Sequence, residues 1–205
     1  MAEPAAPRAV EPGSVLRDED WGGRDVVGEV FEGVELRDCD LTEITTRGAR
    51  FDACTFRGVR LNASRHTGTA FVNCTFDRCV LFDTTFSGCK LTGSTFDACR
   101  LELLKVDGGD WSFVSLGGAD LRQVSIVGAR MREADLSGAR CGDATLRDLD
   151  LAGASLGRID LTGADLRGSD LSALDPLGAR LRGAVLTIDQ AVTVAEALGT
   201  VVRAE

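Results

Sequence analysis

The residues best suited to chemistry in this 205-residue sequence are seven cysteines and a single histidine. Thiolates and imidazoles bind metals and act as nucleophiles or bases, so they could form a metal site, a disulfide framework or a catalytic centre. The histidine, His66, follows Ser64 and Arg65. The cysteines are Cys39, Cys54, Cys74, Cys79, Cys89, Cys99 and Cys141. Their chemistry depends on the elements that hold them.

Those elements repeat every five residues. From Phe71 to Leu101 a large apolar residue opens each block of five, and a small residue stands two places before it. In steps of five from Phe31 to Leu186, only Thr46, His66 and Pro176 interrupt the large apolar positions. The register therefore runs through most of the chain without an inserted loop.

A five-residue repeat excludes both a helix and a flat strand. Five residues of α-helix turn through roughly 500°, so successive large residues would lie about 140° apart and share no face. In a flat strand they would alternate between two faces. A short extended piece followed by a turn satisfies the spacing, and four such pieces close a square on which the next block stacks. We therefore predict an all-β quadrilateral β-helix of about eight coils, roughly 38 Å long.

This geometry removes most of the candidate chemistry. Six cysteines occupy the small inward position and Cys141 a large one, so they are accounted for as buried hydrophobes. With no CxxC pair and one histidine, we expect no metal site and no cofactor. For His66, neighbouring Thr46 and Thr67 predict a partly buried, hydrogen-bonded ring. Regular outward faces without a phosphate-binding loop predict no catalytic residues and no enzymatic activity.

The N-terminal stretch departs from the repeat. Residues 1–20 hold three of the four prolines and show no period, which predicts a disordered leader before a solenoid over residues 21–186. Pro176 falls on an inward position and should disturb the coil there. The sequence contains no apolar run of signal-peptide or membrane-span character, so we expect a cytoplasmic protein that does not bind membranes.

The C-terminal stretch, residues 187–205, predicts a helix and tail that cap the solenoid. Thr187 and Gln190 match a capping box, and Gly199 can end a helix over 188–198. A helix this short is marginal alone, so it should pack on the last coil. The stripe expected to make that contact is Ile188, Ala191, Val192, Ala195 and Leu198.

The charge pattern points to the outer surface. Lys and Arg number 23 against 32 Asp and Glu, a net charge of −9 that disfavours direct nucleic-acid binding. Aspartates that recur in register could be ordinary solvated residues near turns, or they could imitate DNA in a basic groove. About 38 Å of duplex carries roughly 22 phosphates, so such imitation would rest on local patches and shape. The candidate acidic surface is Asp135, Asp150, Asp160, Asp165, Asp170 and Asp175.

Several segments carry a resemblance to a known family. Blocks such as ADLSG, ADLRG and GARLRG resemble the pentapeptide-repeat family and its right-handed quadrilateral β-helix. SRHTGTAFVNCTF, ACRL, SLGGADLR and the ending LTIDQAVTVAEALG resemble its mycobacterial fluoroquinolone-resistance members. The resemblance implies a protein that binds DNA gyrase in place of DNA and lessens the effect of quinolone-type inhibitors. It also implies a homodimer joined at the C-terminal ends, for which the candidate residues are Ile188, Val192, Val194, Leu198, Val201 and Val202.

Two other functions stay open at this point. The chain could be a self-protection factor that guards gyrase from a toxin or antibiotic made by the same cell. It could also be an interaction scaffold unrelated to topoisomerases. The residues themselves predict a non-catalytic, acidic, solenoidal binding protein, and the gyrase target is implied by the resemblance.

Overall fold

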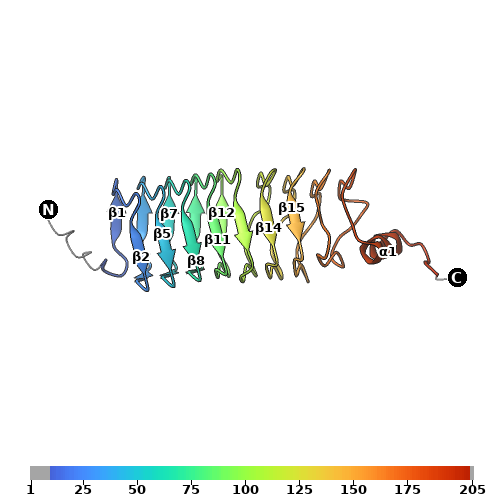
Figure 1. Cartoon of the computed structure of the whole chain (residues 1–205), viewed down its shortest axis with the longest axis horizontal. Helices are drawn as coiled ribbons and strands as arrows, with labels where there is room; N and C mark the ends of the chain where they lie inside the picture. The colour runs from blue at the N-terminus through green and yellow to red at the C-terminus, as the bar shows by residue number, and fades with distance from the viewer. Residues whose placement is uncertain (1–9, 204–205) are drawn as a thin grey trace.

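The computed structural model describes residues 10–203 and shows a rod of stacked coils with a helix at its C-terminal end (Figure 1). Parallel pairing joins residues that are 20 apart: Val15 pairs with Glu35, and Thr75 with Thr95. One coil is therefore four pentapeptides, which confirms the predicted quadrilateral solenoid.

Each coil has four faces, three of which carry three-residue strands. The β1 face holds β1 (Val15–Arg17), β4 (Glu35–Arg37), β7 (Thr55–Arg57), β10 (Thr75–Asp77) and β12 (Thr95–Asp97). The β2 face holds β2 (Asp25–Val27), β5 (Thr45–Arg47), β8 (Arg65–Thr67), β11 (Thr85–Ser87), β13 (Lys105–Asp107), β14 (Ser125–Val127) and β15 (Thr145–Arg147). The β3 face holds β3 (Val30–Glu32), β6 (Arg50–Asp52) and β9 (Ala70–Val72).

Isolated bridges hold the fourth face and extend the other three toward the C-terminus. The fourth face runs through Asp20, Asp40, Arg60, Val80 and Arg100, and then through Asp120, Arg140, Asp160 and Arg180. The β1 face continues through Ser115, Asp135 and Ser155, and the β3 face through Lys90, Asp110, Arg130 and Asp150. In chain order the faces follow one another as β1, fourth, β2 and β3, so the fourth face lies opposite the β3 face.

The core is a set of columns, as the 20-residue register predicts. The rings of Phe31, Phe51 and Phe71 stack with centroids 4.6 and 4.8 Å apart. Phe76 and Phe96 stack at 4.6 Å in the next column. Beyond these rings the buried positions are mostly leucine and alanine. The repeat therefore predicted both the fold and the stacking of its core.

The solenoid begins earlier than predicted. Strand β1 and the Asp20–Asp40 bridge already belong to the first coil, and Leu16 packs against the core. Residues 10–20 are thus not a leader, and the rest of that predicted leader, residues 1–9, lies outside the described residues. Leu16 stands 20 residues before Leu36 and is in register with it, a signal that the surrounding prolines obscured.

The coil is disturbed at Pro176, as its inward position predicts. Gly178 and Ala179 both donate to the carbonyl of Asp175 and close a local turn. After one more edge, helix α1 (Ile188–Ala197) begins with the predicted capping box: Gln190 N donates to Thr187 Oγ1 and Thr187 N to Gln190 Oε1. No helix among residues 10–203 is long and apolar enough to cross a membrane.

The predicted contact stripe of α1 is wrong. Ile188 and Leu198 are 84% and 50% exposed, whereas Gln190 is buried and Val194 packs against the core. Gln190 Nε2 donates to the carbonyls of Leu166 (2.6 Å) and Ser169 (2.8 Å). The open end of the coil presents carbonyl groups as well as apolar side chains, so a carboxamide makes the contact that the apolar stripe was expected to make.

Candidate acidic binding surface

All six predicted surface aspartates have the same local role. Each accepts, through Oδ1, a hydrogen bond from the backbone N–H two residues later, at 2.9 Å for Asp135 and Asp170 and 3.3 Å for Asp150 and Asp165. A short acceptor side chain stabilises a turn in this way. The repeat therefore uses aspartate at these positions for a structural reason, whatever else the carboxylates do.

The six aspartates do not share one face. Asp135 lies on the β1 face, with Asp175 two coils later in the same register, and Asp150 and Asp170 follow each other on the adjoining β3 face. Asp160 lies on the fourth face and Asp165 on the β2 face. The structure thus brings four of the six onto two adjoining faces. We call these four, together with Glu133 at the corner between the faces, the acidic side.

The two remaining aspartates are paired with arginines. Asp165 accepts hydrogen bonds from Arg167 at 2.8 and 2.7 Å, which lower the pKa of its carboxyl to about 2. Asp160 lies 3.4 Å from Arg180, and its pKa is lowered mainly by a hydrogen bond from Thr162. Over residues 140–180 these two faces and their corners also carry Asp143 and Asp148, and the four aspartates are matched by Arg140, Arg147, Arg167 and Arg180.

The acidic side keeps most of its charge unpaired. Within residues 10–203, Asp135, Asp170 and Asp175 form no ion pair. Asp150 is bound by Arg132 at 2.6 Å, and that guanidinium holds the pKa of the Asp150 carboxyl below its usual value. The acidic side as a whole holds five acids and only two arginines, Arg130 and Arg132. The second half of the rod is therefore acidic along one side.

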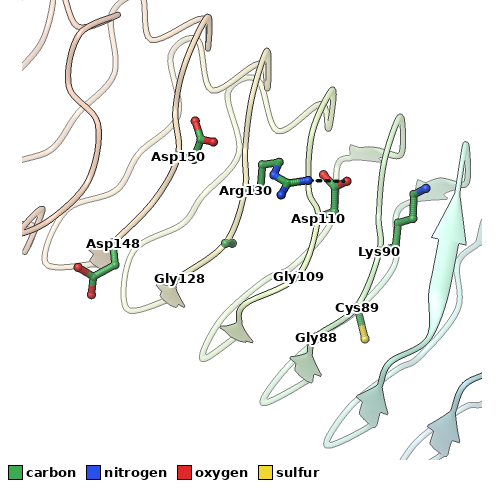
Figure 2. A pocket seen from close by; sticks show the side chains of 10 residues that line it. Gly88, Cys89, Lys90, Gly109, Asp110, Gly128, Arg130, Asp148 and Asp150 are labelled. Atoms are coloured by element: carbon green, nitrogen blue, oxygen red, sulfur yellow. Dashed lines mark ion pairs between the residues drawn. The ribbon is translucent and has the colours of Figure 1, made fainter.

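A shallow trough of about 610 Å³ crosses successive coils on the β3 face. Lys90, Asp110, Arg130 and Asp150 stand on consecutive coils along it, and Arg130 lies 3.7 Å from Asp110 (Figure 2). The rest of the lining is Gly88, Cys89, Gly109, Gly128, Ala129 and Asp148, and the three glycines leave the backbone uncovered there. Alternating charges give this face a pattern that a partner must match, which favours selectivity over general attraction.

His66 and the cysteines have structural surroundings. His66 is fully buried, with Nδ1 2.8 Å from Thr46 Oγ1 and Nε2 3.0 Å from Ser64 Oγ, and burial lowers its pKa to about 3. The predicted companion Thr67 is exposed, because it is the outward residue of β8. Six cysteines are buried and Cys99 is half-buried. Among the described residues, no three His, Cys, Asp or Glu side chains gather as a metal site would require.

The predicted cap and dimer residues divide into two groups. Val194 packs on the solenoid and Val192 is half-buried. The other four, Ile188, Leu198, Val201 and Val202, are exposed, with Ile188 at 84% and Val201 at 79%. An exposed group of large aliphatic residues at one end of a rod is typical of a protein contact surface.

Sequence reasoning missed Glu133 and Gln190. Glu133 was outside the aspartate pattern, although its number in the 20-residue register places it at the corner between the two acidic faces. Gln190 was recognised only for its place in the capping box. Its distance from Ser169, 21 residues or one coil and one residue, is the signal that it would reach the last coil.

A stacked parallel solenoid of pentapeptide coils, with aspartate turns and a small-residue column inside, defines a class of repeat protein. The chain matches the family of pentapeptide repeats in eight copies over residues 67–97, 115–148 and 144–187, and it belongs to that family. Among curated protein sequences, none matches it significantly.

Several solved structures have similar architecture. HetL, a pentapeptide repeat protein involved in heterocyst differentiation regulation from Nostoc sp. strain PCC 7120, is 21% identical, with 88% of this chain and 90% of HetL covered and a TM-score of 0.45. Full-length QnrB1, a plasmid-mediated fluoroquinolone resistance protein, is 20% identical, with 93% and 99% covered and a TM-score of 0.38.

Proposed function

We propose that the chain is a non-catalytic protein that binds DNA gyrase at its DNA-binding surface, and so modulates the enzyme or protects it from fluoroquinolone-type inhibitors. The observation that carries this proposal is the acidic side, where unpaired carboxylates run along the length of the rod. A basic groove that accepts duplex attracts such a surface and is occupied by it. A gyrase partner implies a cytoplasmic protein.

Two matched double variants test the proposal. Asp135→Asn with Asp170→Asn removes two unpaired charges from the acidic side, and Asp160→Asn with Asp165→Asn removes two paired charges elsewhere. Asparagine keeps the Oδ1 acceptor of each turn, so both variants should fold. The measurement is displacement of fluorescent duplex from gyrase by each protein.

We expect the first variant to compete about tenfold more weakly, because each exposed charge contributes up to about 1 kcal/mol, and the second to stay within about twofold of the unaltered chain. Equal competition by all three proteins would remove the acidic side from the binding surface. Failure of the unaltered chain to displace DNA would remove the proposed function.

We further propose that two chains join through their C-terminal ends, because Ile188, Leu198, Val201 and Val202 leave apolar surface exposed beside α1. Replacing Ile188 and Val201 by lysine should convert the dimer to a monomer in sedimentation velocity. Neither residue packs on the last coil, so thermal unfolding should change little. A monomeric unaltered chain at micromolar concentration would contradict the dimer.

A further inference from the structure

One rung of the hydrogen-bond ladder is absent in the middle of the fourth face. In the coil before it, Arg78 N, Leu81 N and Asp83 N donate to Asp97, Arg100 and Glu102 at 2.8 to 3.1 Å. One coil later the corresponding donors, Ala98 N, Leu101 N and Leu103 N, make no backbone hydrogen bond to Gly117, Asp120 and Arg122. We call this missing rung, between 98–103 and 117–122, the breach.

The breach is confined to one side of the rod. At the same level Phe96 N donates to Ser115 O on the β1 face at 3.0 Å, and β13 pairs with β14 on the β2 face. On the β3 face Asp110 bridges Lys90 and Arg130. A cavity of about 350 Å³ opens at the breach between the coils, lined by Phe96, Cys99 and Leu101 among others.

The breach coincides with a change in corner type. Some corners end a strand with a left-handed residue, and at some of these positions the next coil has a two-residue turn that ends in a left-handed glycine. Three corners make this change, from Asn73 to Gly93, from Asp148 to Gly168 and from Ala98 to Gly118. At the first two the bond survives: Asn73 N donates to Thr92 O at 3.0 Å and Asp148 N to Arg167 O at 3.1 Å.

The side chain at the corner distinguishes the two positions where the hydrogen bond between coils is kept from the one where it is lost. A Cβ added to Gly93 or Gly168 would meet Asn73 Oδ1 or Asp148 Oδ1 at 2.4 or 2.0 Å, so those side chains fill the space over the glycine. A Cβ added to Gly118 would meet nothing within 4 Å. Ala98 is too short to fill that space, and the two coils do not close over it.

We propose that the breach is a flexure point at which the two halves of the rod bend relative to each other. Opening lengthens the fourth face while the opposite β3 face stays bonded, so the column through Asp110 and Asp150 becomes the concave side. Closing restores the missing rung and straightens the rod. The curvature of the β3 face is thereby adjustable in the free protein, whether or not gyrase is its partner.

Hydrogen–deuterium exchange of the full chain tests the proposal, with Ala98→Asn as the closing variant. Asparagine suits the left-handed backbone at residue 98, where φ is +49°. In the unaltered chain we expect peptides covering 98–103 to exchange at least about tenfold faster than those covering 78–83. The Ala98→Asn variant should reduce that difference by about tenfold and slow alkylation of Cys99 by iodoacetamide.

Asn73→Ala provides the reciprocal test, since it should open the rung at 73–92 and speed exchange there. Slow exchange over 98–103 in the unaltered chain would overturn the flexure point. Fast exchange that neither substitution alters would overturn the assignment of the breach to the residue at the corner.

Discussion

At the scale of single residues, His66 shows how the repeat tolerates a polar group inside. It occupies a large inward position, stacks on Phe86 at 4.8 Å, and has a hydroxyl partner for each ring nitrogen. The neutral ring is fully satisfied, whereas a protonated ring would be buried with no carboxylate beside it. The sequence predicted the inward position and the Thr46 partner, but it named Thr67 where Ser64 faces the ring.

This burial predicts a dependence of stability on pH. The pKa of His66 is about 3 in the folded chain and about 6.5 when unfolded, so below pH 6.5 the unfolded chain binds the extra proton. The free energy of unfolding should therefore fall by roughly 1.5 to 2 kcal/mol from this group between pH 6.5 and pH 5. Urea unfolding at the two pH values measures it.

His66→Phe is the control for that measurement, because it keeps a ring in the column and removes the titrating group. Carboxylates titrate mainly below pH 5 and act in both proteins. An equal loss of stability in the variant would assign the pH dependence to other groups.

Gly109 is the position where the fold tolerates an added side chain least. Its φ is +92°, and an added Cβ would lie 2.1 Å from the carbonyl oxygen of Cys89. Gly109→Ala should lower the free energy of unfolding by roughly 3 kcal/mol or more. Gly128→Ala, at φ +67° with nothing within 4 Å, should cost only about 1 kcal/mol. Similar losses in thermal or urea unfolding would show that the close approach to Cys89 is relieved elsewhere.

At the scale of elements, α1 closes the solenoid through a carboxamide. Gln190 belongs to the capping box through Oε1 and satisfies two carbonyls of the preceding coil through Nε2. The sequence predicted the start of the helix from Thr187 and Gln190, because a capping box is a local signal. The face that packs on the coil depends on the carbonyls exposed at its end, and no local signal shows those.

Gln190→Glu tests this contact, since it keeps the shape and the acceptor but removes the donors to Leu166 and Ser169. Two buried carbonyls would lose their partners, and we expect a loss of about 3 kcal/mol in the free energy of unfolding. Asp189→Asn in the same helical turn should change it by only a few tenths. Equal, small effects of the two substitutions in chemical denaturation would contradict the carboxamide contact.

The corners mark the limit of prediction for elements. A period of five gives the columns, and a register of 20 gives the stacking of Phe31, Phe51 and Phe71. The period does not distinguish a strand-ending corner at Ala98 from a glycine turn at Gly118, although the bonds between those coils depend on that difference. The early start of the solenoid was missed because prolines outweighed the register of Leu16.

At the scale of the whole molecule, the charge is unevenly distributed around the rod. Acids were predicted to form ladders, and Asp150 and Asp170 do follow each other on the β3 face. The prediction followed the aspartates along the rod, from coil to coil. Which aspartates lie on adjoining faces depends also on their order around each coil. Asp160 and Asp165 then fall among arginines, while Asp135 and Asp175 adjoin the β3 face and leave one long side acidic.

Gyrase supercoiling, with enzyme from the same source, tests the central claim most directly. The folded chain is titrated into the reaction with and without a fluoroquinolone. We expect increasing protein to inhibit supercoiling or to reduce drug-trapped cleavage complexes, and the Asp135→Asn, Asp170→Asn variant to require about tenfold more protein for the same effect. No effect of the unaltered chain in either reaction would contradict the claim that this rod occupies the DNA-binding surface of gyrase.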